Sequence, residues 1–442
     1  MNRLVRGIFV AVLVLAFAAP AEAAIVAHGS VRQVYATDLT PGGSYELVNA
    51  RGAVVAAKAA DVQGSLLFRN VKAGEGYRLR QGGETSQPVT VLTTDPTPPS
   101  TDIYDQEIPS SGYGYITMRD GTQLAIYVRP PQDVTSATPA GKLPAVDAGP
   151  TPTLIEYAGY GYADPNGPES GIAVVGNLMG FTVVNVNMRG TGCSGGAFDF
   201  FEPLQSLDGY DIIETIARQP WVANGKVGMM GISYGGISQL FVGATNPPSL
   251  AALTPISLID QVQTTLFPGG ILNTGFALEW AKDRAREARP AGPEEDQGQR
   301  WAWDRIQGGD QVCAENQKLH SQAVDLLGKV KRNRFYRPRI ADPLSPITFV
   351  DKIKAPTFLA CQWQDEQTGG HCANLADRFT GTDRKWSTFT NGTHIDSLAP
   401  ESFNRWYDFL MLYVAQRAPI TNSAVMQATA PIVYEEAMGI SG

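Results

Sequence analysis

The stretch KVGMMGISYGGISQLFVGATNP, residues 226–247, decides the fold of this chain. It contains a G-x-S-x-G pattern centred on Ser233, and such a pattern marks a nucleophile when a strand enters a sharp turn and a helix leaves it. A strand is predicted over residues 226–230, and the helical spacing that follows the serine involves Ile237, Leu240, Phe241 and Ala244. We therefore predict that Ser233 is a nucleophile on a strand-turn-helix elbow.

A second G-x-S-x-G pattern, in GTGCSGG at residues 190–196, is centred on Ser194. A strand is predicted before this serine, but glycines and an aromatic run follow it, and no helical spacing is present. Because the elbow requires a helix after the serine, we interpret Ser194 as part of a structural loop.

Residues 1–23 have the pattern of a secretory signal peptide. Two arginines lie near the start, an apolar run covers residues 8–19, and a small-x-small cleavage site ends at Ala23. The run is shorter than the roughly 20 residues that a membrane-spanning helix needs. We therefore expect a secreted, periplasmic or cell-envelope protein whose mature chain has no membrane span.

The 442-residue chain has a formal net charge of -8. This acidic balance argues against nucleic acids or anionic membranes as partners. With a serine as the predicted nucleophile, a small ester or a short peptide is the expected substrate. No cofactor or metal-binding signature is present. Four cysteines are too few for a disulfide scaffold, although an exported chain can pair them, and Cys361 and Cys372 are the nearest pair in sequence. The sequence leaves the oligomeric state open.

Short strands separated by glycine-rich turns dominate residues 24–94, which predicts a small all-β, sandwich-like domain. One of its hairpins is expected to turn at residues 49–52. Residues 95–111 are predicted to form a linker, because their Pro/Thr-rich start favours an extended chain. The last predicted segment, residues 419–442, is a C-terminal tail.

Strands alternate with helices over residues 112–418, which predicts an α/β domain with a parallel sheet covered on both faces. It begins with a hairpin that turns at Asp120-Gly121. Asp208 is expected to cap a helix that buries Ile212, Ile213 and Ile216.

A serine hydroxyl needs a base that accepts its proton, and histidine is the usual base. His394 is the favoured candidate, because it follows a predicted strand near the end of the chain and the nucleophile, acid, histidine order of this fold requires a late histidine. His371 is the rival. His28 lies at the mature N-terminus, and His320 is expected to face solvent from a helix.

Asp365 is the favoured acid, because it comes just after the strand predicted over residues 357–361. Asp260, just after the preceding predicted strand, is the competitor. Glu366 is interpreted as a solvated neighbour, and Asp396 lies too close to His394 along the chain to orient its ring.

The oxyanion of an acyl-transfer intermediate needs preorganised hydrogen-bond donors. The backbone N–H of Tyr234, which follows the nucleophile, is one predicted donor. The loop YAGYGY lacks an H-G-G-G motif, so a tyrosine hydroxyl is predicted as the second donor. Position in the sequence alone does not decide which of Tyr157, Tyr160 and Tyr162 is this donor.

Four stretches resemble the serine hydrolases that include bacterial cocaine esterases, glutaryl acylases and X-Pro dipeptidyl-peptidases. They are RDGTQLAIYV, NMRGTGCSGG, DGYDIIETIARQPWVANGKVGMMGISYGG and TPISLID. The resemblance implies an α/β-hydrolase fold with a helical cap before the acid, at about residues 260–345 here. It also implies a tyrosine oxyanion donor at the position of Tyr160. Members of that family usually carry a further C-terminal jelly-roll domain.

The expected function is that of an exported serine hydrolase that cleaves ester or amide bonds through an acyl-enzyme. Its expected site consists of Ser233, Asp365 and His394, with Tyr234 and Tyr160 as oxyanion donors. Within this class, the sequence does not distinguish an X-Pro dipeptidyl-peptidase from a cocaine-esterase-like acyl esterase. The alternative is a binding or cell-envelope protein that keeps the hydrolase fold without chemistry.

Overall fold

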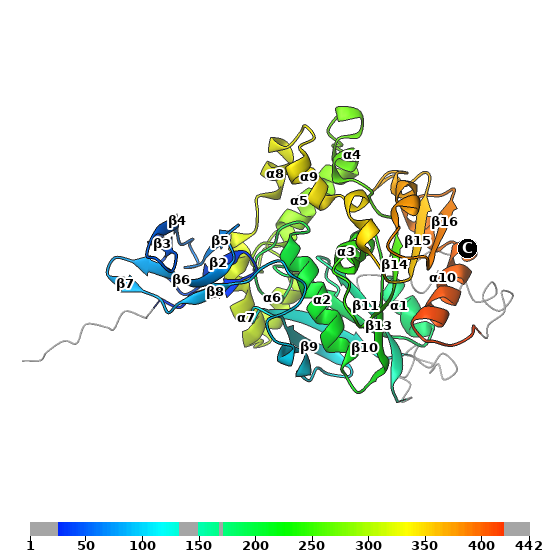
Figure 1. The fold of residues 1–442 in the computed structure, drawn as a ribbon, viewed down its shortest axis with the longest axis horizontal. Coiled ribbons are helices and arrows are strands. Elements are labelled where there is room, and N and C mark those ends of the chain that lie inside the picture. Colours follow the sequence, from blue (N-terminus) through cyan, green and yellow to red (C-terminus); the bar gives the residue numbers. More distant parts are fainter. Residues whose placement is uncertain (1–24, 132–148, 168–170, 420–442) are drawn as a thin grey trace, which may run out of the picture.

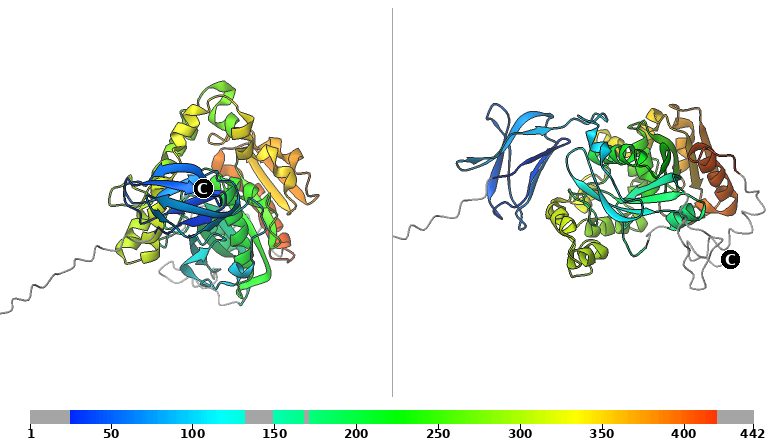
Figure 2. Two further views of the ribbon diagram at one scale, coloured as in Figure 1. Left: turned by 60° about the vertical axis from the view of Figure 1, so that its left-hand side comes forward. Right: turned by 90° about the horizontal axis from the view of Figure 1, so that it is seen from below.

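The structure, a computed structural model, describes residues 25–131, 149–167 and 171–419. Two small sheets form one end of the molecule, and a large sheet flanked by helices forms the rest (Figures 1 and 2). The predicted signal peptide and almost all of the predicted tail lie outside the described residues.

The N-terminal region contains two sheets around a shared apolar core, as predicted. The first sheet has the order β1 (His28–Ser30), β2 (Gln33–Ala36), β5 (Leu66–Arg69). The second has the order β4 (Val54–Ala59), β3 (Ser44–Val48), β6 (Gly74–Gln81), β7 (Glu84–Thr85), and β8 (Val89–Val91) also pairs with β6. The predicted turn between β3 and β4 is confirmed, since Gly52 N–H donates to the carbonyl of Asn49 at 2.8 Å.

The segment after these sheets contacts the rest of the molecule. It includes the short 3-10 helix η1 (Asp102–Asp105). The buried hydroxyl of Tyr104 donates to Asp211 at 2.8 Å, and Asp211 also forms an ion pair with Arg119 at 2.8 Å. These contacts hold the segment against the helix that carries Asp211.

The large sheet has eight strands in the order β16-β15-β14-β13-β11-β12-β10-β9. Six of them run parallel, which confirms the predicted α/β class: β11 (Thr151–Ala158), β12 (Thr182–Asn187), β13 (Val222–Ile232), β14 (Leu250–Ile256), β15 (Thr357–Gln362) and β16 (Lys385–Thr390). The antiparallel hairpin of β9 (Gly112–Thr117) and β10 (Gln123–Arg129) completes one edge, and it turns at Asp120-Gly121 as expected.

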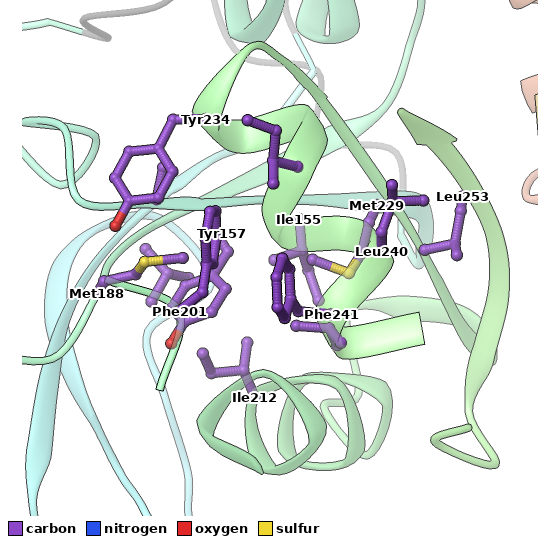
Figure 3. Close-up of a cluster of buried hydrophobic side chains, with 14 of the residues drawn as sticks. Ile155, Tyr157, Met188, Phe201, Ile212, Met229, Tyr234, Leu240, Phe241 and Leu253 are labelled. Carbon is purple, nitrogen blue, oxygen red and sulfur yellow. The ribbon is translucent and has the colours of Figure 1, made fainter. Parts of the chain in front are cut away.

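Helices cover both faces of this sheet over two separate apolar cores. One face packs against α2 (Pro203–Ala217) and α3 (Tyr234–Gly243), and the other against α1 (Gly171–Leu178) and α10 (Pro400–Tyr413). Neighbouring strand residues point to opposite faces. Met229 of β13 accordingly lies in the first core (Figure 3), and Met230 lies in the second.

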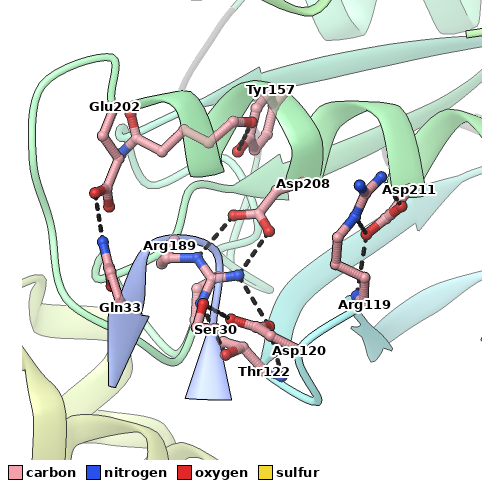
Figure 4. A network of polar contacts seen from close by, with 12 residues as sticks. Ser30, Gln33, Arg119, Asp120, Thr122, Tyr157, Arg189, Glu202, Asp208 and Asp211 are labelled. Atoms are coloured by element: carbon pink, nitrogen blue, oxygen red, sulfur yellow. Dashed lines mark hydrogen bonds and ion pairs between the residues drawn. The ribbon is translucent and has the colours of Figure 1, made fainter. Parts of the chain in front are cut away.

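Asp208 does not cap a helix, contrary to prediction. Helix α2 begins earlier, at Pro203, so Asp208 lies inside it. Its carboxylate instead forms an ion pair at 2.6 Å with the buried guanidinium of Arg189, which also pairs with Asp120 at 3.0 Å (Figure 4). The long-range ion pair explains an acidic residue at this position better than the local capping pattern does.

A helical insertion lies between β14 and β15, within the range expected for the cap. Its α-helices are α4 (Val262–Leu266), α5 (Phe276–Glu287), α6 (Arg300–Gln307), α7 (Gln311–Asn316), α8 (Leu326–Arg332) and α9 (Pro338–Ala341). The 3-10 helices here and beyond it are η3 (Pro268–Gly270), η4 (Gln317–Gln322), η5 (Asp342–Leu344), η6 (Pro346–Thr348), η7 (Val350–Lys352), η8 (Cys372–Arg378) and η9 (His394–Leu398).

The insertion is fastened to the loop after β12. A disulfide joins Cys193 of that loop to Cys313 of α7. His320 of η4 is buried, and its Nε2 lies 2.8 Å from the carbonyl oxygen of Ser194. The expectation that His320 faces solvent is therefore wrong, because the helical spacing around it did not reveal this long-range contact.

Candidate active site

Ser233 lies on a sharp turn between β13 and α3, with φ +59° and ψ -122°. A non-glycine residue rarely adopts a positive φ, and this strain is typical of a nucleophile elbow. The flanking glycines are required by close packing: a Cβ on Gly231 would lie 2.6 Å from the carbonyl carbon of Gly235, and one on Gly236 would lie 2.6 Å from the oxygen of Ile256. The local structure therefore matches the prediction made from the sequence.

Ser194 has a different role, as its sequence context indicated. Its side chain is fully buried; its hydroxyl donates to the carbonyl of Asn187 at 2.7 Å and accepts from the N–H of Ala125 at 2.9 Å. These bonds join the loop after β12 to strand β10.

Asp365 and His394 are in direct contact. Asp365 follows β15, His394 follows β16, and the Nδ1 of His394 lies 2.8 Å from the Oδ2 of Asp365. Both side chains are buried. Burial raises the pKa of Asp365, but its hydrogen bonds with His394 and Thr368 outweigh burial and hold the pKa below the ordinary value. The carboxylate is therefore the stable form beside the imidazole.

The other candidate acids have other partners. Asp260 accepts a hydrogen bond from the side chain of Asn374 at 2.9 Å. Asp396 accepts from the N–H and hydroxyl of Thr393, with which it forms a capping box. Glu366 is more than a solvated neighbour, because its Oε2 accepts from the backbone N–H of His394 at 2.9 Å.

The rival, His371, is not the histidine that contacts Asp365, and neither is His28. His371 is exposed and precedes η8, and His28 stacks on Tyr35 in the N-terminal region with ring centroids 4.9 Å apart. His394 is thus the histidine that the structure pairs with the predicted acid.

The strand order brings Ser233 to the edge of the sheet where Asp365 and His394 lie. The three residues follow β13, β15 and β16, which run parallel through β14. The end of β14 connects them: Ser233 N–H donates to the carbonyl of Ile256 at 2.9 Å, and the hydroxyl of Ser257 donates to the carbonyl of His394 at 2.8 Å.

Of the three tyrosines left open as oxyanion donors, Tyr157 is engaged elsewhere, since its buried hydroxyl donates to the carbonyl of Gln205 at 3.0 Å. Tyr160 lies in the loop after β11, and its ring centroid is 5.5 Å from that of Tyr234. The Nε1 of Trp280, from cap helix α5, donates to the Tyr160 oxygen at 3.0 Å. Tyr162 lies beside the elbow, because a Cβ on Gly235 would be 2.8 Å from its hydroxyl.

The backbone N–H of Tyr234 is at the first turn of α3, where N–H groups have no partner within the helix. Its ring is fully buried, and burial raises the pKa of its hydroxyl well above the ordinary value. The Tyr234 N–H thus lies in the first turn of the helix after Ser233, where the sequence predicts a donor, while its side chain belongs to the core (Figure 3).

An apolar pocket opens above Ser233, between the elbow and the cap. Only two of the described residues around it are charged, and both are basic: Lys329 and Arg337. Its main apolar contributors are Phe200, Ile237, Ile259, Val262, Leu266, Phe267, Phe276, Trp280, Leu326, Val330, Phe335, Ile340 and Leu344. Sequence analysis placed the cap here but identified none of these side chains, because their convergence depends on how the cap helices pack.

The sequence profile of the X-Pro dipeptidyl-peptidase family, S15, matches residues 120–396, more than half of the chain. The chain belongs to the S15 family. It has the α/β-hydrolase fold. The range that matches the S15 family contains Ser233, Asp365 and His394.

Related proteins agree with this family. The S15 chain is 31% identical over 185 residues to a protein of Mycobacterium bovis whose name describes it as a candidate serine esterase. That match covers 38% of this chain and 28% of the relative, so the chain spans well under half of it. A protein of the same description from Mycobacterium tuberculosis matches to the same extent.

Solved structures share the fold. A CocE/NonD family hydrolase from Staphylococcus aureus is 20% identical, with a TM-score of 0.52 over 70% of this chain and 51% of that one. An alpha-amino acid ester hydrolase is 18% identical, with a TM-score of 0.51 over 73% of this chain and 58% of that one.

Asp365, the candidate acid, lies in a loop closed by a disulfide. Cys361 at the end of β15 is bonded to Cys372 at the start of η8, and Asp365 lies between them. The nearest pair in sequence is thus joined, and so are Cys193 and Cys313.

Within residues 25–131, 149–167 and 171–419, no three His, Cys, Asp or Glu side chains gather in a way that could hold a metal ion. In the same part of the chain, no helix combines the length and apolar character needed to cross a membrane.

Proposed function

We propose that this S15 hydrolase is exported and cleaves esters of apolar acyl groups through an acyl-enzyme on Ser233. The observation that carries the proposal is the 2.8 Å contact between His394 and Asp365, at the sheet edge that also presents the strained Ser233. The signal-like pattern of residues 1–23 supports export.

In the proposed mechanism, the Oγ of Ser233 attacks the ester carbonyl carbon while the Nε2 of His394 takes the hydroxyl proton. Asp365 accepts the Nδ1 proton in a hydrogen bond, which leaves Nε2 as the basic nitrogen and stabilises the imidazolium that forms. The alcohol leaves with the proton from His394. Water then attacks the acyl-enzyme, with His394 again as the base. The carboxylic acid is released and the free serine is regenerated.

The oxyanion of each tetrahedral intermediate would be stabilised by the backbone N–H of Tyr234 and the hydroxyl of Tyr160. Tyr160 accepts a hydrogen bond from Trp280, so its own proton must point to another acceptor. Such a donor is most effective in a site from which water is excluded.

The pocket supports an apolar acyl group as the substrate. Burial of such a group contributes roughly 25 cal/mol per Å² of apolar surface. An X-Pro dipeptidyl-peptidase must bind a free α-ammonium, for which carboxylates are the natural partners. The described residues that line the pocket include no Asp or Glu, and both charged ones are basic. This charge favours an ester or acyl substrate, as does the serine esterase name of its mycobacterial relatives.

The test compares the mature chain with Ser233→Ala on p-nitrophenyl butyrate and on an Ala-Pro anilide. We expect turnover of the ester and a loss of roughly 10³-fold or more in Ser233→Ala. Ser194→Ala, in the other G-x-S-x-G, is the matched control and should keep its labelling by a fluorophosphonate probe. Release of Ala-Pro in preference to butyrate would contradict the substrate class, and a folded wild-type protein that the probe leaves unlabelled would favour the non-catalytic alternative.

A further inference from the structure

Residues 326–341 of the cap carry six Lys or Arg and no Asp or Glu, in a chain whose net charge is -8. This segment includes α8 and α9, which lie beside α4 at the top of Figure 1. Nine of the ten residues 331–340 are exposed, and five of these nine are basic: Lys331, Arg332, Arg334, Arg337 and Arg339.

Large apolar side chains are exposed among these charges. Phe335 is 67% exposed and Tyr336 is 49% exposed, and Ile271 of the neighbouring loop is 75% exposed. We call residues 331–340 together with Ile271 and Phe276 the cap rim. Phe276 and Phe335 also line the pocket above Ser233, so the apolar surface of the cap rim continues into that pocket.

The positive charge of the cap rim is largely unneutralised. Arg332 has an exposed ion pair with Asp325 at 3.4 Å, and such surface pairs are weak. The nearby carboxylate of Asp342 accepts a hydrogen bond from Tyr336. Among the described residues, no carboxylate lies within ion-pair distance of Lys331, Arg334, Arg337 or Arg339.

We propose that the cap rim docks on an anionic lipid surface and thereby presents the pocket above Ser233 to acyl chains. Lys and Arg side chains are attracted electrostatically to such a surface. Exposed aromatic and aliphatic side chains insert into the interfacial region beside them. The part that concerns acyl chains rests on the proposed function, whereas the docking itself does not.

The charge and the apolar surface together select this partner. A nucleic acid or an anionic polysaccharide would match the charge but would leave Ile271 and Phe335 in water. A lipid surface covers both and supplies acyl groups at the mouth of an apolar pocket. The acidic net charge does not oppose this, because charges more than about 10 Å away are screened at physiological salt.

The first test measures co-sedimentation of the mature protein with phosphatidylcholine vesicles that either contain or lack phosphatidylglycerol. Lys331→Gln, Arg334→Gln and Arg339→Gln are combined, since these residues do not line the pocket. The matched control combines Arg51→Gln, Lys72→Gln and Lys354→Gln, which removes the same charge from other exposed positions. We expect the cap-rim triple variant to bind anionic vesicles roughly 10- to 100-fold more weakly, and the control to bind like wild type.

The second test separates docking from catalysis. Ile271→Ser with Tyr336→Ser should weaken vesicle binding while turnover of soluble p-nitrophenyl butyrate stays within about twofold, because neither residue lines the pocket. Ser233→Ala should bind vesicles like wild type, so loss of the proposed function would leave docking measurable.

Three results would overturn the proposal. They are equal binding to vesicles with and without phosphatidylglycerol, unchanged binding by both cap-rim variants, and tighter binding to heparin or DNA than to anionic vesicles. A protein dimer that persists on the vesicles and buries Phe335 at its interface would also contradict the proposal.

Discussion

At the residue scale, the candidate site depends on how one carboxylate is held. The Oδ1 of Asp365 accepts from the backbone N–H of Gln367 at 2.9 Å and of Thr368 at 2.7 Å. Its Oδ2 accepts from the hydroxyl of Thr368 at 2.7 Å and faces the ring of His394. Since the folded pKa of Asp365 is depressed, its contribution to stability is present above the unfolded pKa and is lost as pH falls through the folded one.

Asp365→Asn should lower kcat on p-nitrophenyl butyrate by roughly 10³- to 10⁴-fold, because an amide stabilises the wrong imidazole tautomer. The matched control is Asp260→Asn, which changes the competing acid and should stay within about tenfold of wild type. Thermal unfolding checks that both variants fold. A larger loss in Asp260→Asn than in Asp365→Asn would show that the acid is misassigned.

Tyr160→Phe should reduce kcat by roughly 10²- to 10³-fold with little change in KM, because it removes one oxyanion donor and keeps the ring. Tyr162→Phe is the control and should have a small effect on kcat, since its hydroxyl lies against Gly235. The two variants are compared in steady-state kinetics. Equal losses in both would reject Tyr160 as the specific donor.

At the element scale, the site is carried by loops at the carboxyl ends of parallel strands. The two disulfides act on different loops. The Cys361–Cys372 bond closes a short loop around Asp365, with a sequence separation of 11, and the Cys193–Cys313 bond spans a separation of 120. In the chain-entropy account, the longer loop gives the larger stabilisation, about 5 kcal/mol against about 3 kcal/mol.

Cys361→Ser with Cys372→Ser should therefore give the larger loss of kcat of the two double variants, because Asp365 loses its positioning. Cys193→Ser with Cys313→Ser should give the larger drop in melting temperature. Both double variants are measured by ester hydrolysis and calorimetry. If the first pair leaves kcat unchanged, the disulfide does not position the acid.

At the scale of the whole molecule, the N-terminal sheets are joined to the hydrolase by polar contacts. Glu202, which precedes α2, accepts from Gln33 at 2.7 Å (Figure 4) and pairs with Arg69 at 2.9 Å. Lys318 of η4 pairs with Asp38 at 2.7 Å. Burial raises the pKa of Glu202 to about 7, even though Arg69 opposes the shift.

Because this folded pKa lies above the unfolded value of 4.5, the folded state binds more protons between these pH values. The stability contributed by Glu202 is thus present at low pH and is lost as pH rises through about 7. The free energy of unfolding of wild type should fall between about pH 5 and about pH 8. In Glu202→Gln this fall should be smaller by up to about 3 kcal/mol.

The measurement is urea unfolding at both pH values. Glu46→Gln is the matched control, because Glu46 is only partly buried and pairs with Arg80 within the N-terminal sheets. Its effect on the free energy of unfolding is compared with that of Glu202→Gln at both pH values. An identical pH dependence in Glu202→Gln and wild type would show that this carboxyl does not titrate with folding.

The sequence by itself determined the elements whose causes are local. The elbow at Ser233 depends on adjacent glycines and on spacing within one helix, and the hairpin at Asp120-Gly121 depends on two turn residues. Asp365 and His394 could be selected because strands end just before them and parallel strands present their carboxyl ends at one edge.

Only the tertiary structure decided what depends on contacts between distant residues. Asp208 meets Arg189, His320 meets the carbonyl of Ser194, and Cys193 meets Cys313 across a separation of 120 residues. The apolar pocket likewise forms where cap helices converge over the elbow. Local periodicity carries no information about such partners, because sheet order and helix packing bring them together.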